Sequence, residues 1–236
     1  MRPFPPLVLA SGVIAAALFA AVPAVGDESW VSLFPGSGVP IGWTVTAWND
    51  LATPAPAGSA WTVTDGVLTP PTDRGTWLIS EREYGDFVLE FEIRLSERGN
   101  GGVALRAPPA GDPAFDGMEL QLADLRYNTE AKPYELTGAI YRAIAPDRQV
   151  YRPTEWNAVR VELAGPHLKV TINGAVVQDV NLAVVGTPSY RHDGTQAADL
   201  SARPRRGRIG FQHLSRNNEP LAIRHARIWE RSPGTP

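Results

Sequence analysis

Cysteine is absent from this 236-residue chain, and only four histidines are present. Without cysteine there is no disulfide bond and no lipid-attached cysteine, so the fold depends on its core, with or without a bound ion. The histidines show no paired spacing, which excludes the common zinc motifs: His167, His192, His213 and His225. Glycine-rich phosphate loops and nucleophile elbows are missing as well. What remains is chemistry based on carboxylates and on oxygen and amide ligands.

Convincing helical periodicity is also missing. The chain has 22 glycines and 22 prolines, and the turns that they imply are spread along its length. Between them lie short stretches in which apolar and polar residues alternate, the pattern of half-buried strands. Hydrophobic residues make up 43% and charged residues 20%, which is ordinary for a globular protein. The composition therefore favours an all-β fold over a helical one.

An excess of positive charge is lacking too, because the formal net charge is −3. The basic cluster RPRRGR, at 203–208, is interpreted as a solvated loop. Since binding to phosphates requires a basic face, nucleic acid is disfavoured as a partner.

Residues 1–26 differ in composition from the rest. Arg2 precedes the apolar run LVLASGVIAAALFAAV, and the small residues AVPAVG follow. This pattern predicts a cleaved secretory signal peptide, with residues 27–236 as one domain in the periplasm or outside the cell. Cleavage would leave 21 Lys and Arg against 25 Asp and Glu, a net charge of −4. The alternative is an uncleaved anchor, but a span needs about 20 apolar residues, and no second apolar run could cross a bilayer.

Hairpin signals organise the predicted domain. Asp65-Gly66 lies between alternating segments, and Gly165-Pro166 and Asn173-Gly174 separate three more. The segment 87–95 alternates over its whole length, which predicts a strand with one face in a core and one towards solvent or a cleft. TGAIYRAI, at 137–144, is interpreted as a further short strand. Many short antiparallel strands predict one sandwich of two sheets, with a groove on a bent face.

The stretch DGMELQLAD, at 116–124, is the clearest candidate for a site. As a strand it places Glu119 and Gln121 on one face and an apolar row, Met118, Leu120 and Leu122, on the other. Asp124 has the wrong parity to share the polar face unless a bulge or the strand end re-aims it. The polar face is either ordinary wet surface or the floor of a polar site. The spacing is similar to the E-x-D-x-x-E strand of sandwich glucanases, but Gln121 and Asp124 replace two of its carboxylates, which disfavours an endoglucanase.

Several segments in order resemble one family. They are WLISEREYGDFVLEFEIRL, GNGGVALRAP, FDGMELQLAD, LTGAIY, EWNAVRVEL, TINGAVV, GRIGFQHL and IRHARIWE. Together, from about Leu33 to Glu230, they are similar to the 3-keto-disaccharide hydrolase domain family. The resemblance implies a concanavalin-like jelly-roll sandwich of two antiparallel sheets. It also implies activity on 3-keto-glycosides or 3-keto-disaccharides, with the site on the concave sheet.

The family's motifs map onto four stretches of this chain: Gly99–Arg106, Gly117–Gln121, Thr137–Tyr141 and Gly207–Gln212. Three positions depart from the family pattern. Gly101 stands where many members have serine, Leu136 where many have histidine, and His213-Leu214 replaces a usual His-Gly. If those residues carry chemistry in active members, this chain is altered in substrate or mechanism, or only binds.

The resemblance implies roles for particular side chains. A ketone at C3 acidifies the C2 proton, so the site needs a base, a group that holds the enolate oxygen, and a proton donor. Glu119 is predicted as the base or as a metal ligand. Arg106 is predicted to hold the carbonyl or enolate oxygen, or to pair with Glu119. Tyr141 is a predicted donor or else a core residue, and His213 a predicted acid or base, the other three histidines being structural or on the surface.

Asn100, Gln121, Asp124 and Gln212 are predicted to bind the substrate. No cofactor is required by the sequence, but a divalent cation on Glu119 and Asp124 is a further hypothesis.

Trp77 and Trp156 are expected in the core, while Trp48 and Trp61 lie near loops and either join the core or stack on a sugar. The rival functions are a carbohydrate-binding module of the same fold without catalysis, and a structural or adhesion domain.

Overall fold

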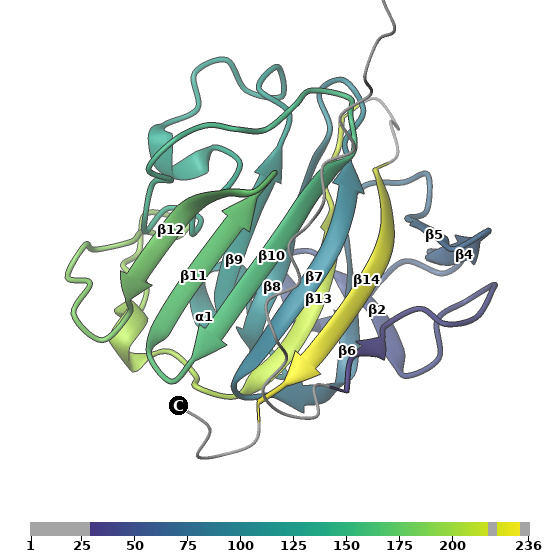
Figure 1. Cartoon of the computed structure of the whole chain (residues 1–236), viewed down its shortest axis with the longest axis horizontal. Helices are drawn as coiled ribbons and strands as arrows, with labels where there is room; N and C mark the ends of the chain where they lie inside the picture. The colour runs from purple at the N-terminus through teal and green to yellow at the C-terminus, as the bar shows by residue number, and fades with distance from the viewer. Residues whose placement is uncertain (1–28, 217–220, 232–236) are drawn as a thin grey trace, which may run out of the picture.

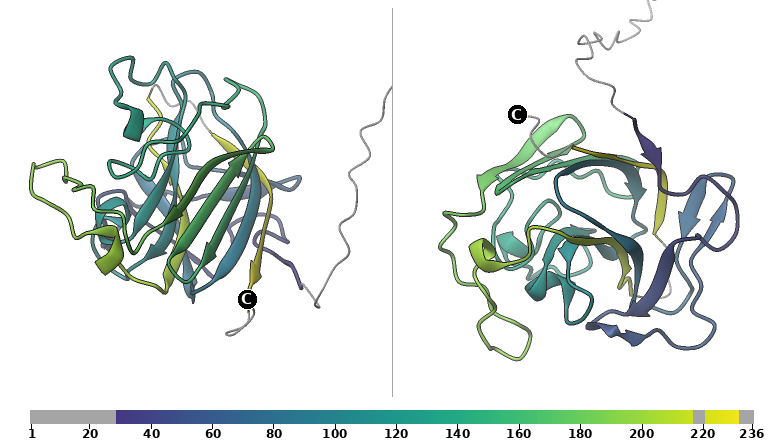
Figure 2. Two further views of the ribbon diagram at one scale, coloured as in Figure 1. Left: turned by 60° about the vertical axis from the view of Figure 1, so that its left-hand side comes forward. Right: turned by 90° about the horizontal axis from the view of Figure 1, so that it is seen from below.

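The computed structural model describes residues 29–216 and 221–231, so the predicted signal peptide lies outside the described residues. Two sheets lie face to face (Figures 1 and 2), and every pairing between their strands is antiparallel, as predicted. The larger sheet contains β1 (Val31–Ser32), β4 (Thr62–Thr64), β5 (Val67–Thr69), β7 (Phe87–Arg94), β10 (Asn157–Ala164), β11 (His167–Ile172), β12 (Ala175–Asn181) and β14 (Ala222–Glu230). The smaller contains β2 (Trp43–Ala47), β3 (Asp50–Pro54), β6 (Thr76–Tyr84), β8 (Asn100–Ala107), β9 (Met118–Ala123) and β13 (Gly207–His213).

Helix is confined to three short pieces in the described ranges: α1 (Pro113–Asp116) and two single 3₁₀ turns, Pro133–Glu135 and Leu200–Ala202. Across 29–216 and 221–231, no helix has the length and apolar character needed to cross a bilayer.

The local turn chemistry explains the predicted hairpins. Asp65-Gly66 joins β4 to β5 with φ angles of 50° and 75°, and Asn173-Gly174 joins β11 to β12 with 50° and 80°. Two consecutive left-handed residues are what a type I′ hairpin turn requires, and Asn or Asp followed by Gly adopts them at least cost. Gly165, also left-handed, turns β10 into β11.

The segment TGAIYRAI is not a strand, so that prediction is wrong. Gly138 and Arg142 both have positive φ, and the chain folds back on itself around an Ile140–Ile144 bridge. It nevertheless lies along β9, because Gly138 donates its backbone N–H to Gln121 O at 2.9 Å and Tyr141 donates to Glu119 O at 2.9 Å.

The main core fills the space between the sheets. β7 covers residues 87–94 of the alternating segment 87–95, and the apolar row of that segment is buried as predicted: Phe87, Leu89, Phe91, Ile93 and Leu95. From the other sheet, Ile209 and Phe211 of β13 and the apolar row of β9 face the same core. Because side chains alternate along a strand, the polar rows of β8, β9 and β13 face away from the larger sheet.

All four tryptophan predictions can be compared with the structure, and Trp48 is half-buried against the small cluster that contains Trp77. Trp77 is fully buried as expected, and Trp61 joins the core, where its indole N–H donates to Thr76 Oγ1 at 3.1 Å. Trp156 is only half-buried, so its predicted place in the core is wrong. The guanidinium groups of Arg94 and Arg224 both lie over its ring, at 4.9 and 4.1 Å from the ring centroid.

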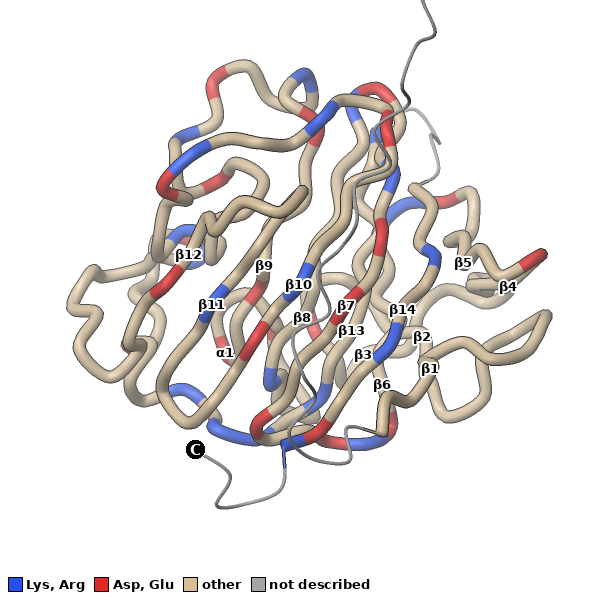
Figure 3. Tube along the Cα trace, viewed as in Figure 1, with Lys and Arg blue, Asp and Glu red and all other residues tan. Residues whose placement is uncertain are grey.

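The outer face of the larger sheet carries paired charges. Figure 3 shows blue and red alternating over β10, β7 and β14. Glu90 pairs with Arg160 and Arg227, and Glu92 pairs with Arg224 at 2.7 Å. Exposed pairs of this kind contribute little to stability, and they make this face of the sandwich a wet surface.

Candidate functional site

A cavity of about 630 Å³ lies on the outward face of the smaller sheet. Its floor is made by polar side chains of three neighbouring strands: Asn100 of β8, Glu119 and Gln121 of β9, and Gln212 of β13. These four residues were predicted at the site, and the structure brings them together. The walls come from the turn after β2, the segment 125–142 and the long connection between β12 and β13.

Glu119 is the central feature of the floor. It is only 4% exposed, and no hydrogen-bond donor meets its carboxyl group within the part of the chain that the structure describes. The carboxyl group lies over Gly102, where an added methyl group would be 2.1 Å from Oε1. Burial, followed by the nearby charge of Asp112, raises the pKa of Glu119 well above 4.5. A carboxyl group in this state is a strong base once it has lost its proton.

Asp112 is a second carboxyl group in the cavity, and the sequence interpretation missed it. It is the N-cap of α1, where Oδ1 accepts the Ala114 N–H at 3.0 Å. Burial raises its pKa to about 6, against the Ala114 hydrogen bond, and the charge of Asp116 raises it further. The signal was present in the sequence, because an Asp before Pro marks a helix start, and Asp112 lies seven residues before Glu119.

The floor also carries three amide side chains. Gln121 Nε2 donates to Asn100 Oδ1 at 3.3 Å, and the Asn100 backbone N–H donates to Ser215 Oγ at 3.0 Å. Gln212 is 4% exposed and lines the same floor. Amides supply both donors and acceptors, which suits sugar hydroxyl groups.

An aromatic wall stands beside the two carboxyl groups. His192 packs against Trp48, Phe115 and Tyr141, with ring centroids 5.9, 5.4 and 6.0 Å away. Burial raises the pKa of Tyr141, which keeps its hydroxyl group protonated. Burial and the charge of Arg142 lower the pKa of His192, so its imidazole is neutral at pH 7.

His192 was expected to be structural or on the surface, but it lines the cavity. Only the tertiary fold reveals this, because His192 comes from a long connection without regular structure.

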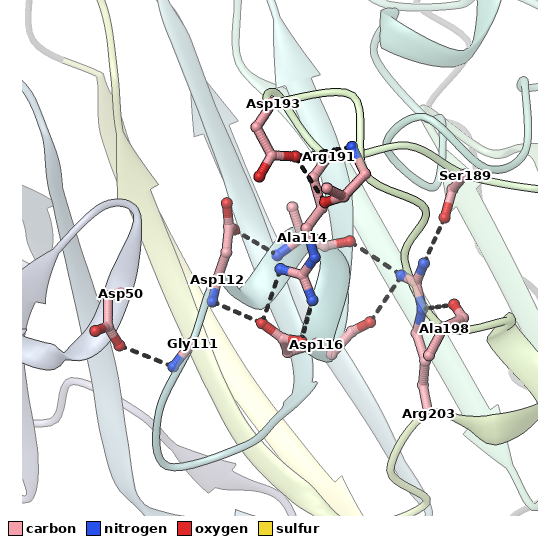
Figure 4. A network of polar contacts seen from close by, with 12 residues as sticks. Asp50, Gly111, Asp112, Ala114, Asp116, Ser189, Arg191, Asp193, Ala198 and Arg203 are labelled. Carbon is pink, nitrogen blue, oxygen red and sulfur yellow. Dashed lines mark hydrogen bonds and ion pairs between the residues drawn. The ribbon is translucent and has the colours of Figure 1, made fainter.

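That connection is fastened to α1 by two arginines (Figure 4). Arg191 donates to both oxygens of Asp116, at 3.1 Å from Nη1 to Oδ2 and 2.5 Å from Nη2 to Oδ1. Arg203 donates to the carbonyl oxygens of Ala114, Gly117 and Ala198 and to Ser189 Oγ. Arg203 is only 4% exposed, so the interpretation of RPRRGR as a wholly solvated loop is wrong at this residue.

Asp124 lines the far end of the floor, at the end of β9, but its oxygens are engaged. Burial opposes its ionisation, yet hydrogen bonds from Arg126, with others from the backbone of Arg126 and Arg98, lower its pKa. Tyr151 donates to Oδ2 at 3.2 Å. A guanidinium group already occupies the place of a cation here, so the residues do not fit the hypothesis of a metal between Glu119 and Asp124. Nowhere in 29–216 or 221–231 do three or more His, Cys, Asp or Glu residues gather as metal ligands do.

The prediction that Arg106 lies at the site is wrong. A bulge shifts the register between β8 and β13, so that Arg208 pairs with Ala107 but Gly210 with Ala104. Arg106 is the extra residue, with φ at 52°. Its fully buried guanidinium donates to Gly85 O, Gly165 O and Asp86 Oδ1, each at 2.8 Å. Its ion pair is therefore with Asp86 and not with Glu119.

His213 does not line the cavity either, contrary to the prediction. It follows Gln212, so strand alternation turns it to the side of Phe211, away from the floor. The ring is fully buried, and burial lowers its pKa. A neutral, enclosed imidazole cannot reach a substrate in the cavity.

The departures at Gly101 and Leu136 have different surroundings. A methyl group at Gly101 would be 2.5 Å from Gln212 O and 2.8 Å from Leu221 Cδ2, so a serine does not fit without a backbone shift. Leu136, in contrast, lines the cavity, so this departure changes the wall that faces a ligand.

The comparisons with known proteins agree with this geometry. A family model for the 3-keto-alpha-glucoside-1,2-lyase-like domain matches residues 29–228. The chain belongs to this family. No curated protein matches. A candidate glycosyl hydrolase from Parabacteroides distasonis ATCC 8503 is similar in structure, with a TM-score of 0.69 at 25% identity over 87% of this chain and 100% of that one.

A second candidate glycosyl hydrolase from the same organism has a TM-score of 0.66 at 21% identity, over 87% of this chain and 95% of the other. LamA E269S from Z. galactanivorans, whose structure holds laminaritriose and laminaritetraose, has a TM-score of 0.50 at 11% identity, over 84% and 96% of the two chains. These more distant structures share the fold. Together the findings confirm the predicted family and its jelly-roll sandwich, and make the chain a glycoside hydrolase-like or carbohydrate-binding protein.

Proposed function

We propose that this protein is an exported enzyme that cleaves glycosides carrying a ketone at C3. Glu119, as the carboxylate, takes the C2 proton, and the electron pair forms an enolate with the C3 carbonyl. The enolate collapses to a C1=C2 double bond while the C1–O bond breaks, and the leaving oxygen takes a proton. Water then adds, with hydroxide at C1 and a proton at C2, to give the free 3-keto sugar.

One observation carries the proposal: Glu119 is an unpaired, buried carboxyl group that opens only to a polar cavity. Its raised pKa matches it to the removal of a weakly acidic C–H proton. A surface carboxylate would be exposed, and a structural carboxylate would accept hydrogen bonds. Glu119 is only 4% exposed and accepts no hydrogen bond from the residues that the structure describes.

Neighbouring groups supply the remaining steps. Asp112, with a pKa of about 6, can deliver a proton to the leaving oxygen. The amide N–H groups of Gln121 and Gln212 line the floor and are the donors for the enolate oxygen in place of Arg106. Trp48 and Tyr141 provide apolar ring surface against the faces of the sugar.

The test is release of a chromogenic aglycone from α- and β-linked 3-keto-glucosides by the purified protein, beside the unoxidised glucosides. We expect turnover of a keto substrate only, and a fall in kcat/KM of about 1,000-fold in Glu119→Gln. Glu130→Gln, which changes an exposed carboxylate outside the cavity, is the matched control and keeps full activity. Deuterium at C2 of the substrate should slow the reaction if proton removal limits the rate.

A second candidate function is carbohydrate binding without catalysis. It is favoured by the aromatic wall of Trp48, Tyr141 and His192 and by the absence of Arg106 from the cavity. Calorimetry with the same sugars separates the two. Binding without turnover of any keto substrate, in folded protein, would support the binding module and contradict the enzyme.

A further inference from the structure

Acidic and basic groups of the cavity lie apart from each other along the strands of its floor. Glu119 lies opposite Ala104 of β8, and Ala104 lies opposite Gly210 of β13. Thr76 pairs with His213, which is three residues beyond Gly210 on β13, and Arg74 lies two residues before Thr76. At about 3.3 Å per residue, Arg74 is at least about 10 Å from Glu119 along the strand direction. The carboxyl groups of Asp112 and Glu119 thus mark one end of the cavity, and Arg74 marks the other.

Arg74 differs from the other arginines around the cavity in its pairing. Arg142 pairs with Glu135 at 3.0 Å, Arg126 with Asp124 at 2.8 Å, and Arg191 with Asp116. Arg74 has no carboxylate within 4.0 Å among the residues that the structure describes. Its contact is a hydrogen bond from NH2 to the hydroxyl group of Tyr127 at 3.3 Å. A guanidinium group has five N–H donors, so most of the donors of Arg74 remain for a ligand.

A second cation, Arg216, lies at this end through its contact with Tyr127. The guanidinium group of Arg216 lies over the Tyr127 ring, 4.5 Å from its centroid. Arg74 and Tyr127 both line the cavity and come from segments 53 residues apart, which this hydrogen bond joins. Tyr127 therefore has one positive group at its hydroxyl and another over its ring face, and the carboxyl groups of Glu119 and Asp112 lie towards the other end of the cavity.

We propose that Arg74 and Tyr127 form a subsite for the leaving group of the glycoside, and that this subsite selects an aglycone bearing a carboxylate. This rests on the proposed function, because it takes the reacting sugar to lie over Glu119. An anionic group next to Glu119 and Asp112 would be repelled, whereas at Arg74 it gains an ion pair. The separation of the carboxyl groups from Arg74 would therefore determine both how the substrate is oriented and whether its leaving group carries a carboxylate.

The experiment compares two isosteric 3-keto-glucosides, with 3-carboxyphenyl and 3-carbamoylphenyl leaving groups. The ratio of their kcat/KM values is measured in the wild type, in Arg74→Gln and in Arg206→Gln. Arg206 is an exposed arginine near Glu83, at the opposite end of β13 from Arg74. The Arg206→Gln substitution therefore removes the same charge away from the proposed subsite. Taking ratios within each protein cancels the intrinsic difference between the leaving groups.

We expect Arg74→Gln to lower the preference for the carboxylate about fivefold, the size of a partly exposed ion pair, with Arg206→Gln unchanged. Raised salt should lower the wild-type preference in the same direction. An unchanged ratio in Arg74→Gln, or an equal fall in Arg206→Gln, would overturn the subsite.

Binding of the two unoxidised glucosides, measured by calorimetry, separates this inference from the proposed chemistry. If no keto substrate is cleaved but the Kd ratio favours the carboxylate and falls in Arg74→Gln, the subsite stands and the proposed reaction fails. If the keto substrates are cleaved and neither ratio responds to Arg74, the reaction stands and the subsite fails.

Discussion

Two adjacent glycines in β8 have opposite surroundings. Gly101 faces the core side, where an added methyl group would meet the backbone oxygen of Gln212. Gly102 faces the cavity, where the three atoms nearest to an added methyl group all belong to the Glu119 side chain. The first glycine is therefore needed for packing, and the second leaves space for the carboxyl group that we propose as the base.

Gly102→Ala tests this division. The new methyl group would displace the Glu119 carboxyl group, and misplacing a catalytic group by about 1 Å can cost about 100-fold in rate. We expect kcat/KM on the keto substrate to fall by about that factor, with a loss of unfolding free energy below about 1 kcal/mol. Gly85→Ala, where the added methyl has 3.6 Å to its nearest neighbour, is the control. Full activity in Gly102→Ala would contradict the role of Glu119.

The raised pKa of Asp112 predicts a dependence of stability on pH. The folded state holds this proton more tightly than the unfolded chain, in which the pKa is near 3.8. The group therefore stabilises the fold fully below about pH 3.8, and the contribution is lost as the pH rises through about 6. Asp112→Asn keeps an N-cap acceptor but does not titrate.

Urea unfolding at about pH 4 and about pH 7 measures the effect. The Asn variant should gain stability over the wild type as the pH rises between these values. A difference between the two proteins that stays constant with pH would be inconsistent with a buried, titrating Asp112.

At the scale of elements, the sequence predicted what local chemistry determines. The Asp65-Gly66 and Asn173-Gly174 turns, the alternation of β7 and the polar face of β9 follow from short patterns, and the structure confirms them. The place of Arg106 could not be predicted, because one inserted residue in β8 redirects it, and a bulge leaves no reliable pattern in a single sequence. His192 was missed for a related reason: its position depends on the ion pair between the neighbouring Arg191 and Asp116 of α1, a distant segment.

The connection that carries His192 gives a prediction at this scale. Arg191→Gln removes its half-exposed ion pair with Asp116, which should cost less than about 1 kcal/mol of unfolding free energy. The looser wall should still lower kcat/KM several-fold, because His192 would no longer be held against Trp48 and Tyr141. Urea unfolding and kinetics on one preparation measure both, with Arg206→Gln as the control. A proportional loss of both quantities would point to a purely structural role.

Across the whole molecule, Arg106 ties the two sheets together. Its guanidinium group, on the smaller sheet, reaches Gly85 and Asp86 in the turn between β6 and β7 and Gly165 in the turn between β10 and β11. One side chain thus fixes the ends of both layers at the same edge of the sandwich. This accounts for a buried arginine without assigning it any catalytic role.

Arg106→Met should lower the unfolding free energy by about 3 kcal/mol, because it leaves two partly buried carbonyl groups and the Asp86 carboxylate without their donor. The folded fraction should keep its activity within about twofold. Arg82→Met, which breaks an exposed pair with Glu230, is the control and should cost under about 1 kcal/mol. A large loss of kcat/KM in folded Arg106→Met would restore the sequence-based prediction that this residue serves the site.

The turn that follows β9 has a consequence beyond the site. β9 is the outermost strand of its sheet, and such a strand normally offers free backbone groups to other chains. Here Gly138, Ala139 and Tyr141 occupy those of Glu119 and Gln121. The segment that brings Tyr141 to the cavity therefore also covers this edge of the sheet against pairing with a second molecule. Loosening this turn would expose the strand and favour aggregation as well as inactivation.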